Sequence, residues 1–178
     1  MISTRILPLV SLLLVASIFG FFYAWVCSTM LGLDASDPAV AIQAMQAMNA
    51  SVRNAVFFPA FFLTPVVLAS TAAALVRKGR RNAALWFGLA AVVYSLGGFG
   101  VTIALNVPMN EALALIELPL EPAAAETVWR DYSSSWQVWN QVRALACAVA
   151  VLLTGTGLLT TGSVPQAARG QVNAPGTL

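Results

Sequence analysis

The chain has 178 residues, of which 59% are hydrophobic and 9% are charged, and its net charge is +2. Because soluble domains carry roughly a quarter charged residues, this chain has too few charges to cover a surface exposed to water. The small net charge argues against nucleic-acid binding, and the absence of histidine removes the commonest metal ligand and the usual general base. The composition therefore predicts a membrane protein whose main partner is the lipid bilayer.

Four hydrophobic segments are long enough to cross a bilayer core of roughly 30 Å, which takes about 20 helical residues. They cover about residues 6–30, 55–76, 83–105 and 137–161. Lipid offers no partner for backbone N–H and C=O groups, so each segment must be a helix. The first segment is too long for a typical signal peptide and no clear cleavage site follows it, so we expect it to be retained.

The segments together predict an all-α fold, an integral membrane four-helix bundle over residues 1–162 with short helices in its two outer loops. Residues 163–178 are rich in Gly, Pro, Ala and Gln, which is typical of a disordered tail. The short loop between the second and third segments carries four basic residues, Arg77, Lys78, Arg80 and Arg81. This charge predicts that the loop and both termini lie on the cytoplasmic side of the inner (plasma) membrane.

Both outer loops contain signals for a helix start. Asp37 is expected to cap a helix over residues 38–49, with proline in the first turn. Asn110 is expected to cap a second short helix over residues 111–118. The pair at 121–122 predicts the start of the long helix that becomes the fourth span.

Small residues recur at positions that allow helices to approach closely. In the first segment they stand four residues apart, at Ala16, Gly20, Ala24 and Ser28. The third segment contains Gly97, Gly98 and Gly100. These faces could serve contacts within the bundle or a homo-oligomer. Two cysteines, Cys27 and Cys147, stand alone in apolar segments and suggest neither a disulfide framework nor a zinc site.

The fourth helix gathers aromatic and polar side chains on one face when successive residues are rotated by about 100°. This face comprises Trp129, Tyr132, Trp136, Trp139, Asn140, Arg143 and Cys147. A charge within a span costs several kcal/mol unless it is paired or hydrated, so Arg143 should face the bundle interior or reach the interface. The alternative is an ordinary interfacial belt of tryptophans with a snorkelling arginine.

Several residues could contact Arg143 if it faces inward. The candidate partners are the carboxylates and amides of Glu111, Glu117, Asn49, Asn106 and Asn110. Trp136 or Trp139 could stack on the guanidinium plane. A pocket walled by these tryptophans and Arg143 would favour ligand binding, whereas a filled bundle top with Arg143 bonded to loop carbonyls would favour a structural role.

The pattern Asn106-x-Pro108-x-Asn110, followed by Trp129 and Trp136-x-x-Trp139-Asn140-x-x-Arg143, resembles a family of small four-helix membrane proteins described as anthrone oxygenase-like. Gly20 to Ala24 and Asn49 also fit, and the resemblance covers most of the chain. It implies an oxidation of anthrones to anthraquinones without a metal or flavin, as associated with some fungal members. It places site positions at Asn49, Asn106, Asn110, Trp136, Asn140 and Arg143.

Three kinds of function are compatible with these observations. The first is a cofactor-independent oxygenase acting on a hydrophobic aromatic molecule, in which Arg143 and the amides stabilise an enolate or phenolate. Its catalytic residues would be Arg143, Asn140, Asn106, Asn110 and Glu111, and its substrate-binding residues would be Trp136, Trp139, Trp129 and Asn49. The base would be Glu111, Glu117 or solvent. The other two are a non-catalytic binding, transport or complex-subunit protein, and a purely structural membrane protein.

Overall fold

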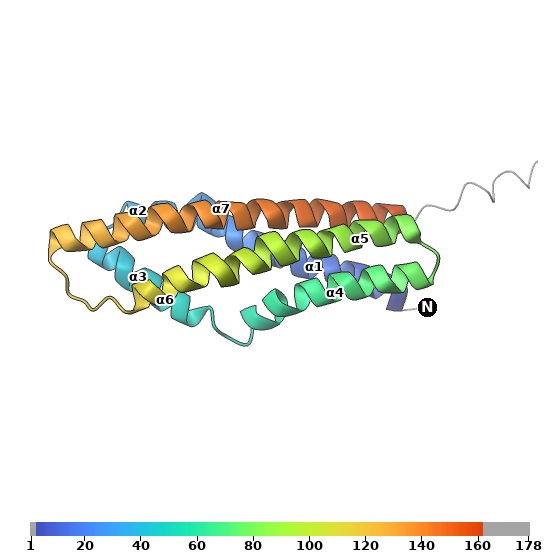
Figure 1. Cartoon of the computed structure of the whole chain (residues 1–178), viewed down its shortest axis with the longest axis horizontal. Coiled ribbons are helices and arrows are strands. Elements are labelled where there is room, and N and C mark those ends of the chain that lie inside the picture. The colour runs from blue at the N-terminus through green and yellow to red at the C-terminus, as the bar shows by residue number, and fades with distance from the viewer. Residues whose placement is uncertain (1–2, 162–178) are drawn as a thin grey trace, which may run out of the picture.

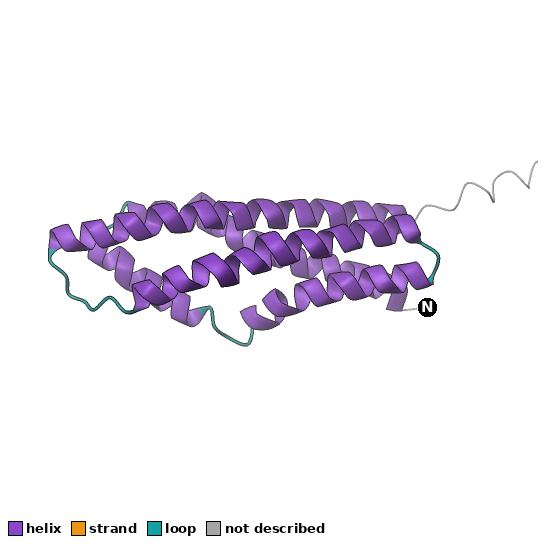
Figure 2. Ribbon diagram, in the orientation of Figure 1, coloured by secondary structure: helices purple, strands orange, loops and turns teal. Residues whose placement is uncertain are grey.

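A computed structural model describes residues 3–161, and these residues form an all-helical bundle with its long helices side by side (Figure 1). Helices joined by short loops account for this whole part of the chain (Figure 2). Four helical runs are long and apolar enough to cross a membrane. The predicted fold class is therefore confirmed. The tail predicted over residues 163–178 lies outside the described residues.

The first half of the chain forms two long helical runs with a short helix between them. The elements in order are α1 (Ser3–Ala24), the π-helical segment η1 (Trp25–Thr29), α2 (Met30–Asp34), α3 (Pro38–Ser51) and α4 (Phe57–Arg77). Helix α3 begins as predicted, because the Asp37 side chain accepts hydrogen bonds from the backbone N–H groups of Ala39 and Val40. Pro65 lies inside α4, whereas Pro59 falls in its first turn.

The second half forms the other two long runs. They comprise α5 (Arg81–Val93), the π-helical segments η2 (Tyr94–Gly100) and η3 (Thr102–Asn106), α6 (Val107–Ala114), and α7 (Pro122–Thr161). The predicted start of α7 is confirmed. The predicted cap at Asn110 is wrong, because the third run continues without a break through η3 into α6 and leaves Asn110 inside the helix. Pro108 lies inside this continuous run and does not end it.

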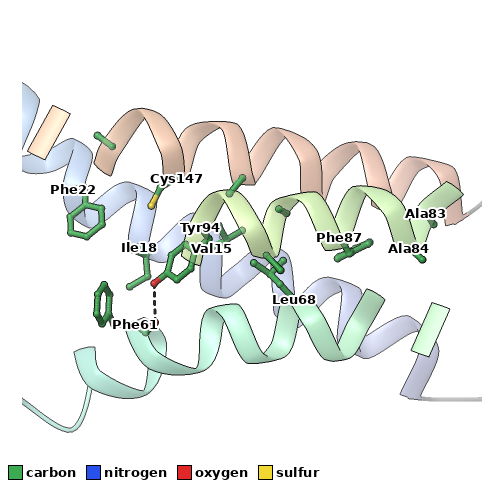
Figure 3. Close-up of a cluster of buried hydrophobic side chains, with 14 of the residues drawn as sticks. Val15, Ile18, Phe22, Phe61, Leu68, Ala83, Ala84, Phe87, Tyr94 and Cys147 are labelled. Carbon is green, nitrogen blue, oxygen red and sulfur yellow. Dashed lines mark hydrogen bonds between the residues drawn. The ribbon is translucent and has the colours of Figure 1, made fainter. Parts of the chain in front are cut away.

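Two hydrophobic clusters fill the bundle. The longer one lies between α1, α4, α5 and α7 and includes Phe22, Phe61, Leu68, Phe87 and Tyr94 (Figure 3). The Tyr94 hydroxyl donates a hydrogen bond to the carbonyl of Phe61 at 2.9 Å, which satisfies its one polar group in this apolar setting. The second cluster lies where α2, α3 and α6 meet the first half of α7, and it is rich in tryptophan and methionine.

Two glycines of the third run, Gly97 and Gly98, serve contacts within the chain. A Cβ atom placed at Gly97 would overlap the Cβ of Ala146 on α7, and one at Gly98 would lie 3.0 Å from the Cys147 sulfur. The small-residue face on α1 is different, since a Cβ at Gly20 would meet no heavy atom within 4 Å. Gly97 and Gly98 therefore allow η2 to approach α7 closely.

Candidate functional site

The buried face of α7 carries the polar and aromatic stripe. Trp129, Trp136, Asn140, Arg143 and Cys147 are all buried, with exposed fractions of 6%, 3%, 1%, 4% and 0%. The opposite side of the helix is exposed. Trp139 departs from the predicted stripe, because its side chain lies at the edge of the buried face and is 36% exposed. The structure thus brings the stripe into the bundle but leaves Trp139 outside it.

Arg143 is buried inside the bundle. One of its terminal nitrogens donates to the Asn140 Oδ1 atom at 2.9 Å, and the other donates to the Thr102 hydroxyl at 3.3 Å. Its guanidinium carbon lies 4.4 Å from the ring centroid of Phe22 and 5.1 Å from that of Trp136. The charge is therefore enclosed between two aromatic rings, which stabilise it by cation–π attraction.

No carboxylate forms an ion pair with Arg143 among residues 3–161. Glu111 lies on the surface instead, where it pairs with Arg53 at 3.5 Å and its side chain is 61% exposed. Glu117 is likewise exposed. The structure therefore does not bring the two predicted acidic partners to the guanidinium.

Within residues 3–161, two buried side-chain polar atoms have no hydrogen-bond partner. They are the Nε atom of Arg143, a donor, and the Oδ1 atom of Asn106, an acceptor. The amide nitrogen of Asn106 donates to the Trp136 carbonyl at 3.4 Å, and the amide nitrogen of Asn140 donates to the Phe22 carbonyl at 3.2 Å. Buried polar groups are nearly always paired, so this donor and this acceptor are available to a polar group of a bound molecule.

Asn110 joins the site to the outer helices. Its Oδ1 atom accepts hydrogen bonds from the Tyr132 hydroxyl and from the Trp136 indole N–H, both at 2.8 Å. Asn49 of α3 donates to the same tyrosine oxygen at 3.4 Å. Asn110 thereby fixes the indole that covers Arg143.

The sequence did not single out Asp34, although it anchors the first run to α7. Its carboxylate accepts from the Trp129 indole at 3.0 Å, from the Ser133 hydroxyl at 2.7 Å and from the Gln137 amide at 2.9 Å. Residues 129, 133 and 137 share one face of α7, and this spacing was the sequence feature that could have indicated a common acceptor for their side chains. Asp34 could reach that face only because η1 and α2 continue the first helix as far as this residue.

π-Helical turns accompany the site on two of the four runs. Thr102 and Asn106 are the first and last residues of η3, and Phe22 lies just before η1. Such turns are rare and occur frequently at functional sites. The glycines at 97, 98 and 100 indicated close helix packing, and nothing in the sequence marked the π-helical turns.

A groove of about 290 Å³ opens between α6 and the first part of α7. It is lined by Met109, Ala112, Leu113, Ile116, Val128, Asp131, Tyr132 and Ser135. Its wall does not include Arg143, Trp136 or Trp139, so it is not the pocket around these residues that would favour ligand binding over a structural role. Within the described part of the chain, no three His, Cys, Asp or Glu side chains gather as a possible metal site.

A comparison with protein families gives one match. The model of a family described as anthrone oxygenase matches residues 47–153, which is more than half of the chain. The matched range includes Asn49, Asn106, Asn110, Trp136 and Arg143 as well as the whole groove. No curated protein and no solved structure matches the chain. The resemblance inferred from the Asn-Pro-Asn and Trp-Asn-Arg patterns is confirmed, and the chain belongs to the anthrone oxygenase family.

Proposed function

We propose that this protein oxidises a hydrophobic aromatic molecule of the anthrone type, without a cofactor, at Arg143. One observation carries the proposal: a buried guanidinium has no carboxylate partner among residues 3–161 and keeps one N–H group free. A buried cation without a counter-charge is unfavourable, and an anionic ligand removes that cost. Membership of the anthrone oxygenase family supplies the class of substrate.

The anion in this proposal is the enolate of the substrate. An anthrone loses a proton from its central CH₂ carbon to water at the outer end of the bundle before it reaches Arg143, and the negative charge moves to the carbonyl oxygen. The free Nε–H of Arg143 donates to that oxygen, while the free Oδ1 of Asn106 accepts from a substrate hydroxyl. Donors fixed in a site with little water stabilise such an oxyanion strongly.

Molecular oxygen completes the reaction. The enolate carbon gives electrons to O₂ and a C–O bond forms, which yields a hydroperoxide after uptake of one proton. Loss of water then leaves a second carbonyl group, so CH₂ and O₂ become C=O and H₂O. The rings of Phe22 and Trp136 keep water away from the guanidinium and strengthen its field. Glu111 is engaged with Arg53 at the surface, so the proposal assigns it no role as base.

Turnover by Arg143 variants tests this proposal. The protein in lipid nanodiscs is supplied with a hydroxylated anthrone in air, and quinone absorbance and oxygen uptake are followed. Arg143→Gln is expected to lower kcat about 100-fold, because an oxyanion donor is lost. Arg143→Lys is expected to keep more of the rate than Arg143→Gln, since lysine supplies the positive charge but not the planar guanidinium group with its fixed N–H donors.

Arg130→Gln is the matched control, because Arg130 lies on the same helix with its side chain 66% exposed and paired with Asp131. It should keep the full rate. A folded Arg143→Gln protein that oxidises the anthrone as fast as the wild type would contradict the proposal.

A non-catalytic binding role is the second candidate. The observation that favours it is the groove between α6 and α7, which has the dimensions of a ligand site but lies away from Arg143. In that case the protein would bind aromatic molecules without consuming oxygen, as a carrier or as a subunit of a membrane complex.

We further propose that the protein lies in the inner (plasma) membrane with both termini in the cytoplasm. The basic loop between α4 and α5 supports this orientation. In intact cells, a membrane-impermeant maleimide should label Ser134→Cys, which lies at the other end of the bundle. It should label Lys78→Cys only after lysis, and the reverse pattern would invert the topology.

A further inference from the structure

We propose that the groove between α6 and α7 is a separate binding site that takes a neutral, hydroxylated aromatic molecule before it reaches Arg143. The ligand class rests on the proposed function. The position of the site rests on the groove itself, whose walls come from two helices with few contacts between their facing sides.

Each wall of the groove is one face of a helical segment. Met109, Ala112 and Leu113 lie on α6, and Ile116 follows just after its end. Val128, Asp131, Tyr132 and Ser135 stand at helical spacings of three, four and seven on α7. A loop over residues 115–121 joins these two helices (Figure 1), and the groove lies between them.

The size and chemistry of the walls select the ligand. A volume of about 290 Å³ is near the lower limit for small-molecule pockets and suits one compact ligand rather than a peptide. Met109, Leu113, Ile116 and Val128 offer apolar contact. The Asp131 carboxylate on the rim, 71% exposed, forms an ion pair with Arg130 at 3.6 Å, so the groove has no free positive charge to hold an anion, while the carboxylate still accepts a hydrogen bond from a hydroxyl group. The groove therefore favours the neutral form of a phenol or alcohol.

The groove is separate from Arg143, and hydrogen bonds through Asn110 link the two places. Tyr132 and Arg143 are eleven residues apart on α7, which corresponds to about 16 Å along the helix axis. The Tyr132 ring lines the groove, and its hydroxyl shares the Asn110 acceptor with the Trp136 indole that covers the guanidinium. A ligand would thus meet a carboxylate in the groove and a cation deeper in the bundle, so its neutral form is bound first and its anion is stabilised later.

Photolabelling tests the groove directly. The probe is a benzophenone that bears a hydroxymethyl group, which is neutral, aromatic and hydroxylated and which inserts readily beside a methionine sulfur. Irradiation of the full-length protein in nanodiscs, followed by peptide mass spectrometry, should place the label on Met109. Ala112→Trp fills the groove from an exposed position and should lower this labelling about tenfold.

Ala114→Trp is the matched control, because Ala114 is also exposed on α6 but does not line the groove. It should leave the labelling of Met109 unchanged. Circular dichroism and size exclusion establish that both variants fold. Labelling that is equal in Ala112→Trp and the wild type, or that never falls on groove residues, overturns the proposal.

The two proposals fail in different ways. Labelling of Met109 that depends on Ala112, in a protein that never oxidises an anthrone, supports the groove and contradicts the oxidation at Arg143. Oxidation that depends on Arg143, in a protein whose groove is never labelled, contradicts the groove alone.

Discussion

At the scale of residues, the site depends on three asparagines with different tasks. Asn140 accepts from Arg143, Asn106 keeps a free acceptor, and Asn110 holds Tyr132 and Trp136. Cation–π attraction contributes about 0.5 to 2 kcal/mol per ring, which is less than the several kcal/mol needed to bury a charge. The two rings therefore offset only part of the cost of burying the guanidinium charge, and an anionic ligand would offset more of it.

Asn110→Ala should destabilise the protein by about 1–3 kcal/mol, because two buried donors lose their shared acceptor. Tryptophan fluorescence during thermal unfolding in detergent measures this loss as a lower Tm. Asn82→Ala, at an exposed position near the start of α5, is the control and should leave Tm unchanged. Equal Tm values for the two variants would show that the Asn110 bonds contribute nothing.

The sequence predicted the residues of the site better than their partners. Helical spacing placed Trp136, Asn140 and Arg143 on one face, and all three are buried. It could not predict that Phe22 covers Arg143, because their contact depends on how α1 is rotated against α7. Nor could it predict that Glu111 turns to Arg53, since the continuous α6 carries this glutamate to an exposed side.

At the scale of elements, close packing of η2 on α7 brings the third run to the site. Gly97 and Gly98 permit this approach because a side chain at either position would meet Ala146 or Cys147. Thr102 and Asn106 follow on the same run, so the position of both depends on these glycines. The sequence indicated close contact from the glycines but gave no sign of the π-helical turns, which arise where helices adjust to their neighbours.

Gly97→Ala should destabilise the bundle by about 1–3 kcal/mol, because the new methyl group overpacks the contact with Ala146. Gly88→Ala on the same run meets no heavy atom within 4 Å and should stabilise the protein by up to about 1 kcal/mol. Thermal unfolding of both variants measures the difference. Shifts of the same sign would contradict the close contact between η2 and α7.

At the scale of the whole molecule, hydropathy was enough to predict four long helices, because a bilayer core dictates about 20 apolar residues per span. The first and third helical runs extend beyond the predicted spans, to Asp34 and Ala114. These extensions build the outer layer with α3 and the start of α7, where Asp34, Asn110 and the groove lie. The groove was not predictable, because the sequence gives the order of α6 and α7 along the chain but not the distance between them.

The central claim is that Arg143 holds the anionic form of an aromatic ligand. Its most direct test is an absorbance titration with pH of a hydroxyanthraquinone bound to the protein in nanodiscs, since its colour changes on ionisation. The ligand should ionise at a lower pH with the wild type and with Arg130→Gln than with Arg143→Gln or with empty nanodiscs. Ionisation at the same pH with the wild type and with Arg143→Gln would contradict the claim.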